Sequence, residues 1–405
     1  MLLSRRHVVL GPPGALAAAA LPAAACADPG TGTEVTVLEA GKDGFNGAVP
    51  GPVIRARRGG GVTVRLLNRL DEPLALCWHG VRAANAMDGS TPAALVAPGA
   101  AATFSVTVPD AGTFFYRAVP RPRQEAGLYG ALVVAEPSPP AVDQDQVLVF
   151  DSRPDSRGSP RWTVDGAAVH DIAVRTNERL RLRFVNASAV HALQARIENH
   201  PVLVMALDGE PAEPFASRDG AVTLAPGSRA DVFADATLAP GTIAPVMFTV
   251  SGGGEPPALR VSYGPAPARA TPLTPPPPLP ANPLPERINL AGAVRATLAL
   301  AAVPPPARQR SADAPVLFTA EHGRTVVLTL DNRDALAHVV YLGGHHCRVL
   351  DRLDDGWKPY WLDTVAVAPG EIVRVAFVAA SAGRFRIESG AISGAAVREH
   401  RFEIR

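Results

Sequence analysis

The chain has 405 residues, which exceeds one ordinary compact domain and suggests two or three. Its 39 Lys and Arg residues almost balance 38 Asp and Glu residues, giving a formal net charge of +1. So balanced a chain has no overall field to attract nucleic acid or an anionic membrane, and we expect neither as a partner. The 41 prolines occur without a glycine repeat, which excludes collagen and long helical bundles.

Residues 1–27 have the pattern of a targeting segment. The arginine pair Arg5 and Arg6 precedes an apolar run rich in Ala and Leu, and small residues follow up to Ala27. The pair is similar to the twin-arginine signal, which exports folded proteins. We therefore expect a cleaved signal peptide and a periplasmic protein. Lipidation at Cys26 is the weaker alternative, because the expected Leu of a lipobox is missing before it.

The remainder of the chain has neither a membrane span nor a disulfide framework in its sequence. No later stretch reaches the roughly 18 uncharged apolar residues that a spanning helix needs. Only Cys77 and Cys347 remain, which are too few for disulfide bonds to stabilise a chain of this size. A hydrophobic core must therefore carry the stability.

Short runs of alternating apolar and polar residues, broken by Pro and Gly, follow one another along the chain. The clearest are residues 62–67, 102–108, 131–134, 146–150, 179–186, 202–207 and 325–332. Short strands at this spacing predict β-sandwiches or barrels. A Pro-dense stretch that contains four consecutive prolines at 275–278 predicts a stiff, extended linker.

Three parts of the chain share one sequence pattern, which we call the repeated phrase. It is a strand that ends in Asn and is followed downstream by Ala-Pro-Gly. The strand-final residues are Asn68, Asn186 and Asn332, and the Ala-Pro-Gly turns occupy 97–99, 225–227 and 368–370. Such a repeat indicates three copies of one β-domain. We predict domains at 28–140, 141–263 and 288–405, with the linker at 264–287.

Several longer sequence segments, which we call motif words, resemble segments of the multicopper oxidases. Those similar to the family's first domain are residues 45–55, 68–73, 78–80, 85–89, 110–116 and 127–132. Those similar to its middle and last domains are Leu207-Asp208-Gly209, residues 225–231, Asp363-Thr364-Val365, residues 368–371 and residues 383–385. The resemblance covers nearly the whole mature chain. It implies an all-β fold of three cupredoxin-like Greek-key β-sandwich domains.

In that family, a mononuclear copper is bound by two His and a Cys, and a trinuclear copper cluster is bound by histidines. The ligands come in four motif words. The first, His-Trp-His-Gly, reads Cys77-Trp78-His79-Gly80 here. The second ends in His-x-His, and here Arg117-Ala118-Val119 stands in its place. The resemblance therefore leaves His79 as a ligand of the first word, with the soft donor Cys77 beside it.

The other two words align with the last domain. In the third, His-Pro-x-His-x-His, only His338 keeps the identity of a ligand. The fourth, His-Cys-His-x-x-x-His, falls on residues 388–394, where Ser389 replaces the Cys. A blue-copper site needs the thiolate and both imidazoles. We therefore interpret His79, His338 and Cys77 as remnants of copper motifs and expect no cofactor, with copper as the alternative.

Two further expectations concern residues near these words. His345-His346-Cys347 is rich in donors, but strand alternation would place His346 on the face opposite the other two. A new metal site that joins His345 or His346 to Cys77, His79 or Cys347 is therefore the weaker reading. We expect Arg117 to pair with Glu388, which replaces another ligand in the same region.

Two functions remain. The first is a copper-free pseudoenzyme on a multicopper oxidase scaffold, with no catalytic residue, which binds and stabilises an envelope protein partner. It would be similar to the twin-arginine-exported periplasmic cell-division protein of that superfamily. The second is a copper-binding oxidoreductase with rearranged ligands. The missing donors favour the first.

Overall fold

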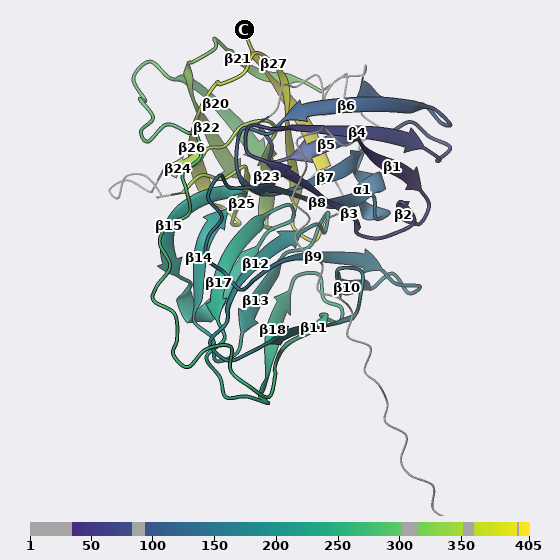
Figure 1. The fold of residues 1–405 in the computed structure, drawn as a ribbon. Helices are drawn as coiled ribbons and strands as arrows, with labels where there is room; N and C mark the ends of the chain where they lie inside the picture. The colour runs from purple at the N-terminus through teal and green to yellow at the C-terminus, as the bar shows by residue number, and fades with distance from the viewer. Residues whose placement is uncertain (1–34, 83–93, 302–313, 351–359, 395–396) are drawn as a thin grey trace, which may run out of the picture. The chain divides into compact units, whose positions relative to one another are not determined.

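A computed structural model describes residues 35–82, 94–301, 314–350, 360–394 and 397–405 (Figure 1). These residues belong to one compact unit. The signal segment and the motif word at 85–89 lie outside the described residues. No helix among the described residues is long and apolar enough to cross a membrane.

The first domain consists of two four-stranded sheets, in the orders β2-β1-β4-β6 and β3-β8-β7-β5. Its strands are β1 (Val35–Gly41), β2 (Gly44–Phe45), β3 (Gly51–Arg57), β4 (Gly61–Asn68), β5 (Ala75–His79), β6 (Ala101–Thr107), β7 (Gly112–Val119) and β8 (Tyr129–Ala135), and α1 (Arg121–Glu125) precedes β8. Alternation in β4 buries Val62, Val64 and Leu66 between the sheets and leaves Arg65 in solvent. The expected two-residue period therefore builds this core.

The second domain has a six-stranded sheet, β10-β9-β12-β17-β14-β15, and a five-stranded sheet, β11-β19-β18-β13-β16. The elements are β9 (Gln144–Pro154), β10 (Pro160–Val164), β11 (Val169–Val174), β12 (Arg179–Asn186), β13 (Leu193–Ile197), β14 (Val202–Leu207), β15 (Glu210–Ala216), the 3₁₀ turn η3 (Arg218–Gly220), β16 (Ala221–Leu224), β17 (Arg229–Asp235), β18 (Ile243–Val250) and β19 (Ala258–Tyr263). Every residue of β12 is buried, including its arginines, because its polar face meets the first domain.

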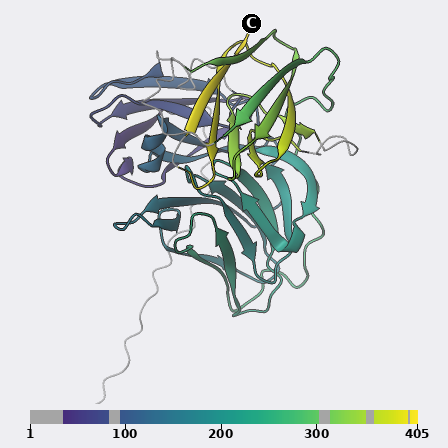
Figure 2. The ribbon, with the colours of Figure 1, turned by 180° about the vertical axis from the view of Figure 1, so that it is seen from behind.

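The third domain has a four-stranded sheet, β20-β22-β26-β24, and a five-stranded sheet, β21-β28-β27-β23-β25. Its strands are β20 (Val294–Leu300), β21 (Val316–Ala320), β22 (Thr325–Asn332), β23 (His338–Leu342), β24 (Arg348–Leu350), β25 (Thr364–Val367), β26 (Ile372–Val378), β27 (Gly383–Ala391) and β28 (Val397–Ile404). Figure 2 shows these green and yellow strands from the side opposite to Figure 1.

The three domains share one topology. In each, two strand pairs are parallel and the other pairs are antiparallel. The parallel pairs are β1–β4 and β3–β8, β9–β12 and β11–β19, and β20–β22 and β21–β28. This confirms the predicted all-β fold of three cupredoxin-like sandwiches. The boundary residues given above stay predictions.

The repeated phrase has a physical cause in the side chain of its Asn. The amide nitrogen of Asn68 donates to the backbone oxygen of Val96, at 2.9 Å, just before the Ala-Pro-Gly turn. Asn186 reaches the equivalent oxygen of Leu224 at 3.1 Å, and Asn332 reaches that of Val367 at 3.0 Å. In all three domains, one amide therefore ties the end of a strand to a turn 28 to 38 residues later.

The Pro-rich linker is extended and contains no strand among the described residues between β19 and β20. It is nevertheless anchored. The side chain of Asn282 accepts a hydrogen bond from the backbone nitrogen of Ala111 and donates one to the oxygen of the same residue, at 2.9 and 2.8 Å. Asn282 also donates to Glu210 at 2.9 Å. The linker therefore contacts the first and second domains before the chain enters the third.

Candidate functional site

Buried charged side chains from all three domains meet around Arg229 of β17. Its guanidinium has no exposure and donates to both carboxylate oxygens of Asp363, at 2.9 and 2.5 Å. It also donates to the backbone oxygens of Thr113 in β7 and of Asp208 after β14, at 3.3 and 2.7 Å. A guanidinium stays charged in proteins and presents donors in a rigid fork. Arg229 therefore ties the three domains together.

Asp208 and Asp363 form the acidic side of this contact. One carboxylate oxygen of Asp208 accepts the backbone nitrogens of Asp363 and Thr364, at 3.2 and 3.1 Å. Burial, together with neighbouring Asp363, raises the pKa of Asp208 to about 7. Burial also disfavours the charged form of Asp363, but Arg229 outweighs it and holds the pKa of that carboxyl well below its usual range. Asp363 is therefore the ionised partner of Arg229.

A buried cluster of ion pairs in the second domain also binds the first domain. Asp231 of β17 accepts Thr113 of β7 at 2.5 Å and also binds Arg181 and Arg183 of β12, at 2.5 and 3.0 Å. These arginines lie on the face of β12 that alternation alone would assign to solvent. Although burial penalises its charge, Arg181 and Arg183 lower the pKa of Asp231. The polar face of this strand is therefore an interdomain surface.

The four words aligned with copper motifs meet between the first and third domains. They lie on β5 and β7, which pair with each other, and on β23 and β27, which also pair. The His79 ring stacks between Phe115 and Tyr341, with ring centroids 4.4 and 3.8 Å away. The words that the resemblance groups together are therefore close in space.

Both ring nitrogens of His79 have partners. Nε2 lies 3.1 Å from Thr364 Oγ1, and that hydroxyl donates to Asp363 at 2.6 Å. Nδ1 accepts from Arg117 Nε at 3.4 Å. Burial lowers the pKa of His79 to about 4, against the opposing effect of Asp363. The imidazole is therefore neutral, and its Nδ1 lone pair accepts a hydrogen bond from a guanidinium.

The expected ion pair between Arg117 and Glu388 is present. Arg117 Nη2 donates to Glu388 Oε2 at 2.7 Å, and Arg386 donates to Oε1 at 3.0 Å. Burial favours the neutral acid, but the two guanidinium groups outweigh it and lower the pKa of Glu388. A cavity of about 30 Å³, room for about one water molecule, lies beside this pair.

The donors that line this cavity do not fit a copper cluster. Copper in an N-donor site needs several neutral imidazoles with free lone pairs. The lining residues include one imidazole, His79, together with Arg117, Glu388 and Ser389. A guanidinium cannot ligate, and it repels an arriving cation. A tightly paired Arg and Glu therefore fill the space where the motif words meet.

The other two predicted site residues lie elsewhere. His338 begins β23, and its Nε2 lies 2.9 Å from Asp334 Oδ2; it does not line the cavity. Cys77 is buried in the core of the first domain, on β5 opposite Arg117 of β7. The structure thus brings His79 and Arg117 together and keeps His338 apart from them.

The run His345-His346-Cys347 is divided between two environments. His345 lies among Phe377, Phe385 and Phe402, with ring centroids 5.3, 4.6 and 5.4 Å away, and burial lowers its pKa to about 4. Cys347 is in the same core. Within the part of the chain that the structure describes, neither joins Cys77 or His79 in a group of three possible metal ligands.

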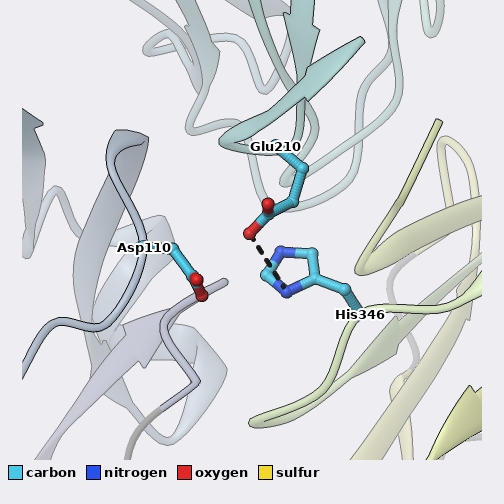
Figure 3. A group of neighbouring side chains, drawn as sticks. All are labelled: Asp110, Glu210 and His346. Atoms are coloured by element: carbon cyan, nitrogen blue, oxygen red, sulfur yellow. Dashed lines mark ion pairs between the residues drawn. The ribbon is translucent and has the colours of Figure 1, made fainter. Parts of the chain in front are cut away.

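His346 faces the second domain instead (Figure 3). Its Nε2 lies 3.2 Å from the backbone oxygen of Asp208 and 3.4 Å from Asp363 Oδ2, and its Nδ1 lies 3.7 Å from Glu210 Oε1. Burial alone would lower the pKa of His346, but Glu210 and Asp363 raise it to about 9. Burial raises the pKa of Glu210 to about 8.

Sequence reasoning missed five buried charged residues at the place where the three domains meet, which we call the junction. They nevertheless lie within words that the family resemblance had marked: Asp110 in 110–116, Asp208 in 207–209, Arg229 and Asp231 in 225–231, and Asp363 in 363–365. A charged residue that lies inside a motif word, next to a glycine or at the start of a strand, was the available signal for a buried charge.

Gly80 gives a direct test of how tightly this junction is packed. Its φ is +86°, and a Cβ there would overlap the Arg229 guanidinium and lie 2.6 Å from Asp363 Oδ2. We expect Gly80→Ala to lower the free energy of unfolding by about 2–4 kcal/mol, measured by thermal melting. Gly99→Ala is the matched control, because Gly99 has φ +74° and open space around it. Equal losses in the two variants would contradict close packing on the ion pair.

Comparisons with known proteins agree on one family. Three family models described as multicopper oxidase match residues 33–139, 131–244 and 283–390. The multicopper oxidase MmcO of Mycobacterium tuberculosis is 26% identical over 42% of this chain and 43% of its own length. L-ascorbate oxidase of Cucurbita maxima is 28% identical over 44% of this chain and 39% of its own. The match therefore spans less than half of these curated relatives.

Solved structures extend the likeness over most of the chain. A multi-copper oxidase from Pseudomonas thermotolerans has a TM-score of 0.77 at 24% identity, covering 92% of this chain and 99% of that one. Lac15 from a marine microbial metagenome has a TM-score of 0.74 at 27% identity, covering 92% and 100%. The fold is therefore shared along nearly the full described length.

Proposed function

The chain belongs to the multicopper oxidase superfamily, and we propose that within it this protein is a copper-free binding protein of the cell envelope. In this proposal it stabilises a protein partner and transfers no electrons to dioxygen. Membership of a fold family does not fix the chemistry, which depends on the residues of the site.

One observation carries the proposal: Arg117 and Glu388 form a buried ion pair where the four motif words meet. A functional copper cluster needs ligands that are free to give their lone pairs to the metal. Here the Nδ1 lone pair of His79 accepts from Arg117, and Ser389 offers a neutral hydroxyl where the family motif has a thiolate. The site is therefore built to hold domains together.

A hollow on the first domain supports a binding role. It lies over the outer face of the sheet of β1, β4 and β6, and its lining is mainly apolar: Val35, Val37, Arg65, Ala101, Ala102 and Thr103. Val35 and Val37 are 48% and 46% exposed. Exposed apolar patches of this kind mark interaction sites. We propose it as a contact surface for the envelope partner.

A copper oxidoreductase with rearranged ligands is the alternative, because the relatives include proteins named oxidase and copper resistance protein A. Metal analysis of protein made in copper-rich medium separates the two. We expect no blue absorption band, no oxidation of phenols or cuprous ion, and less than one bound copper per chain.

Two variants make that experiment specific. His79→Ala removes the imidazole that faces the cavity, and His322→Ala removes an exposed histidine as a control. A blue band with several coppers per chain would refute the binding role. Copper near one equivalent that is lost only with His79→Ala would establish the rearranged site instead.

We also propose a periplasmic location, reached through the twin-arginine route. Changing Arg5 and Arg6 together to Lys should leave the protein in the cytoplasm, because that route requires the guanidinium pair. Cell fractionation measures the result. The same double change at the exposed residues Arg161 and Arg295 should leave export unchanged. Normal export of the Arg5/Arg6 variant would exclude this route.

A further inference from the structure

We propose that Asp110, Glu210 and His346 bind one divalent transition-metal cation of the zinc type, at the junction of the three domains. This goes beyond the proposed function and involves none of the copper motif words. Asp110 lies between β6 and β7, Glu210 begins β15, and His346 lies between β23 and β24. One ligand atom from each lies within 4.8 Å of the others, and all three residues are buried (Figure 3).

Two of these atoms face each other at ion-pair distance without a hydrogen bond. Glu210 Oε1 and His346 Nδ1 are buried, lie 3.7 Å apart and make no hydrogen bond. His346 Nε2 faces the backbone oxygen of Asp208 and the carboxylate of Asp363, both of which are acceptors, so Nε2 carries a proton. When the ring is neutral, Nδ1 is a bare lone pair that faces a carboxylate oxygen. A cation between the two atoms satisfies both.

Neighbouring groups already hold these ligands in place. Asn282 donates to Glu210 Oε2 at 2.9 Å and leaves Oε1 turned toward His346. Arg82 donates to both oxygens of Asp110, at 2.6 and 2.5 Å. A carboxylate has about four lone-pair positions, so Asp110 can bind a metal while it accepts from Arg82. Hydrogen bonds of this kind orient the ligands of metal sites.

The charges of the junction leave room for a cation. Asp110, Asp208, Glu210 and Asp363 are four buried carboxyl groups. In the described part of the chain, two guanidinium groups pair with them, those of Arg82 and Arg229. With all four carboxylates ionised, four minus two leaves two negative charges, and because the pKa of His346 is about 9 its protonated ring offsets one of them until a metal displaces that proton. A divalent cation balances them, although Arg82 opposes it at Asp110.

The donor set selects the class of metal. One imidazole nitrogen and two carboxylate oxygens suit Zn²⁺, whose bonds of about 2.0–2.2 Å place tetrahedral ligand atoms about 3.3 Å apart. The separation of 3.7 Å between Nδ1 and Oε1 is close to this value. Because each ligand comes from a different domain, the cation links all three domains. Among the residues that the structure describes, no cysteine sulfur is near enough to join the group.

The test uses the full chain made in zinc-supplemented medium, washed free of loose metal and analysed for zinc. We expect about one Zn²⁺ per chain, and a fall of about tenfold or more in bound metal for Glu210→Gln and His346→Gln. His345→Gln is the matched control, since that ring lies in the phenylalanine core. Zinc retained by both ligand variants, or absent from the parent protein, would overturn the proposal.

X-ray absorption of the zinc-loaded parent protein needs no variant and therefore still decides if the variants fail to fold. We expect one imidazole, oxygen donors and no sulfur. A sulfur shell, or two or more imidazoles, would place the metal elsewhere and refute this site. Because copper at the motif words would depend on His79, the result is separable from the copper experiment.

Discussion

Replacing Arg229 by methionine should lower the free energy of unfolding by about 3–5 kcal/mol. The side chain is completely buried, and the change removes the guanidinium partner of the ionised Asp363 carboxylate, leaving it with His346 at 3.4 Å. It also removes the donor to the backbone oxygens of Thr113 and Asp208. For a chain of this length the loss corresponds to a fall of roughly 4–6 °C in melting temperature, measured by calorimetry.

Arg260→Met is the control for that experiment. Arg260 pairs with Asp171 on the surface, where the two side chains are 51% and 39% exposed. An exposed pair contributes about 0–1 kcal/mol, so this variant should melt close to the parent protein. If Arg229→Met also melts within 1 °C of the parent, Arg229 does not hold the junction together.

Substitution of Arg117 and Glu388 should give strongly non-additive losses. Arg117→Met leaves Glu388 with Arg386 alone, and Glu388→Gln leaves two guanidinium groups without their carboxylate. Each single variant should lose about 3 kcal/mol, because an uncompensated charge stays buried. The double variant should lose less than either single variant, which corresponds to a coupling of at least about 3 kcal/mol. Simple additivity would reject the pair.

The same pair predicts how stability changes with pH. The pKa of Glu388 is lowered in the folded protein by Arg117 and Arg386, against the effect of burial. Its contribution is therefore fully present above the unfolded pKa of about 4.3 and is lost as the pH falls below it. Melting temperatures measured from pH 7 down to 3 should fall less steeply for Glu388→Gln than for the parent.

An exposed pair provides the control for the double-mutant cycle. Arg69 and Glu39 are 3.3 Å apart, and their side chains are 57% and 49% exposed. Their coupling should stay below about 1 kcal/mol and should weaken with added salt. A coupling as large as that of Arg117 and Glu388 would mean that burial is not the cause of the difference.

Local patterns predicted much of the fold. Two-residue alternation identified strands such as β4, and the phrase ending in Asn68, Asn186 and Asn332 identified the repeat. The phrase worked because each Asn bonds to a turn of its own domain. Alternation was misleading for β12, where Arg181 and Arg183 are buried against another domain.

The site was predictable only where the motif words fixed the register. The Arg117–Glu388 pair followed from two aligned words and is present at 2.7 Å. The contact between Arg229 and Asp363 joins residues 134 positions apart on different domains. The sequence around either residue does not predict its partner, because the two residues meet only when the domains dock. The environment of His346 was hidden for the same reason.

The polar character of this junction has a consequence for the order of synthesis. Until the third domain has emerged from the ribosome, the surface that it will cover presents Arg229, Asp208 and Glu210, together with β7, to water. Such charged groups are well hydrated. At these positions, the incomplete nascent chain therefore exposes polar groups and not apolar surface that would aggregate with other nascent chains. Docking of the third domain removes these charges from water, and only then does Arg229 gain its carboxylate partner Asp363.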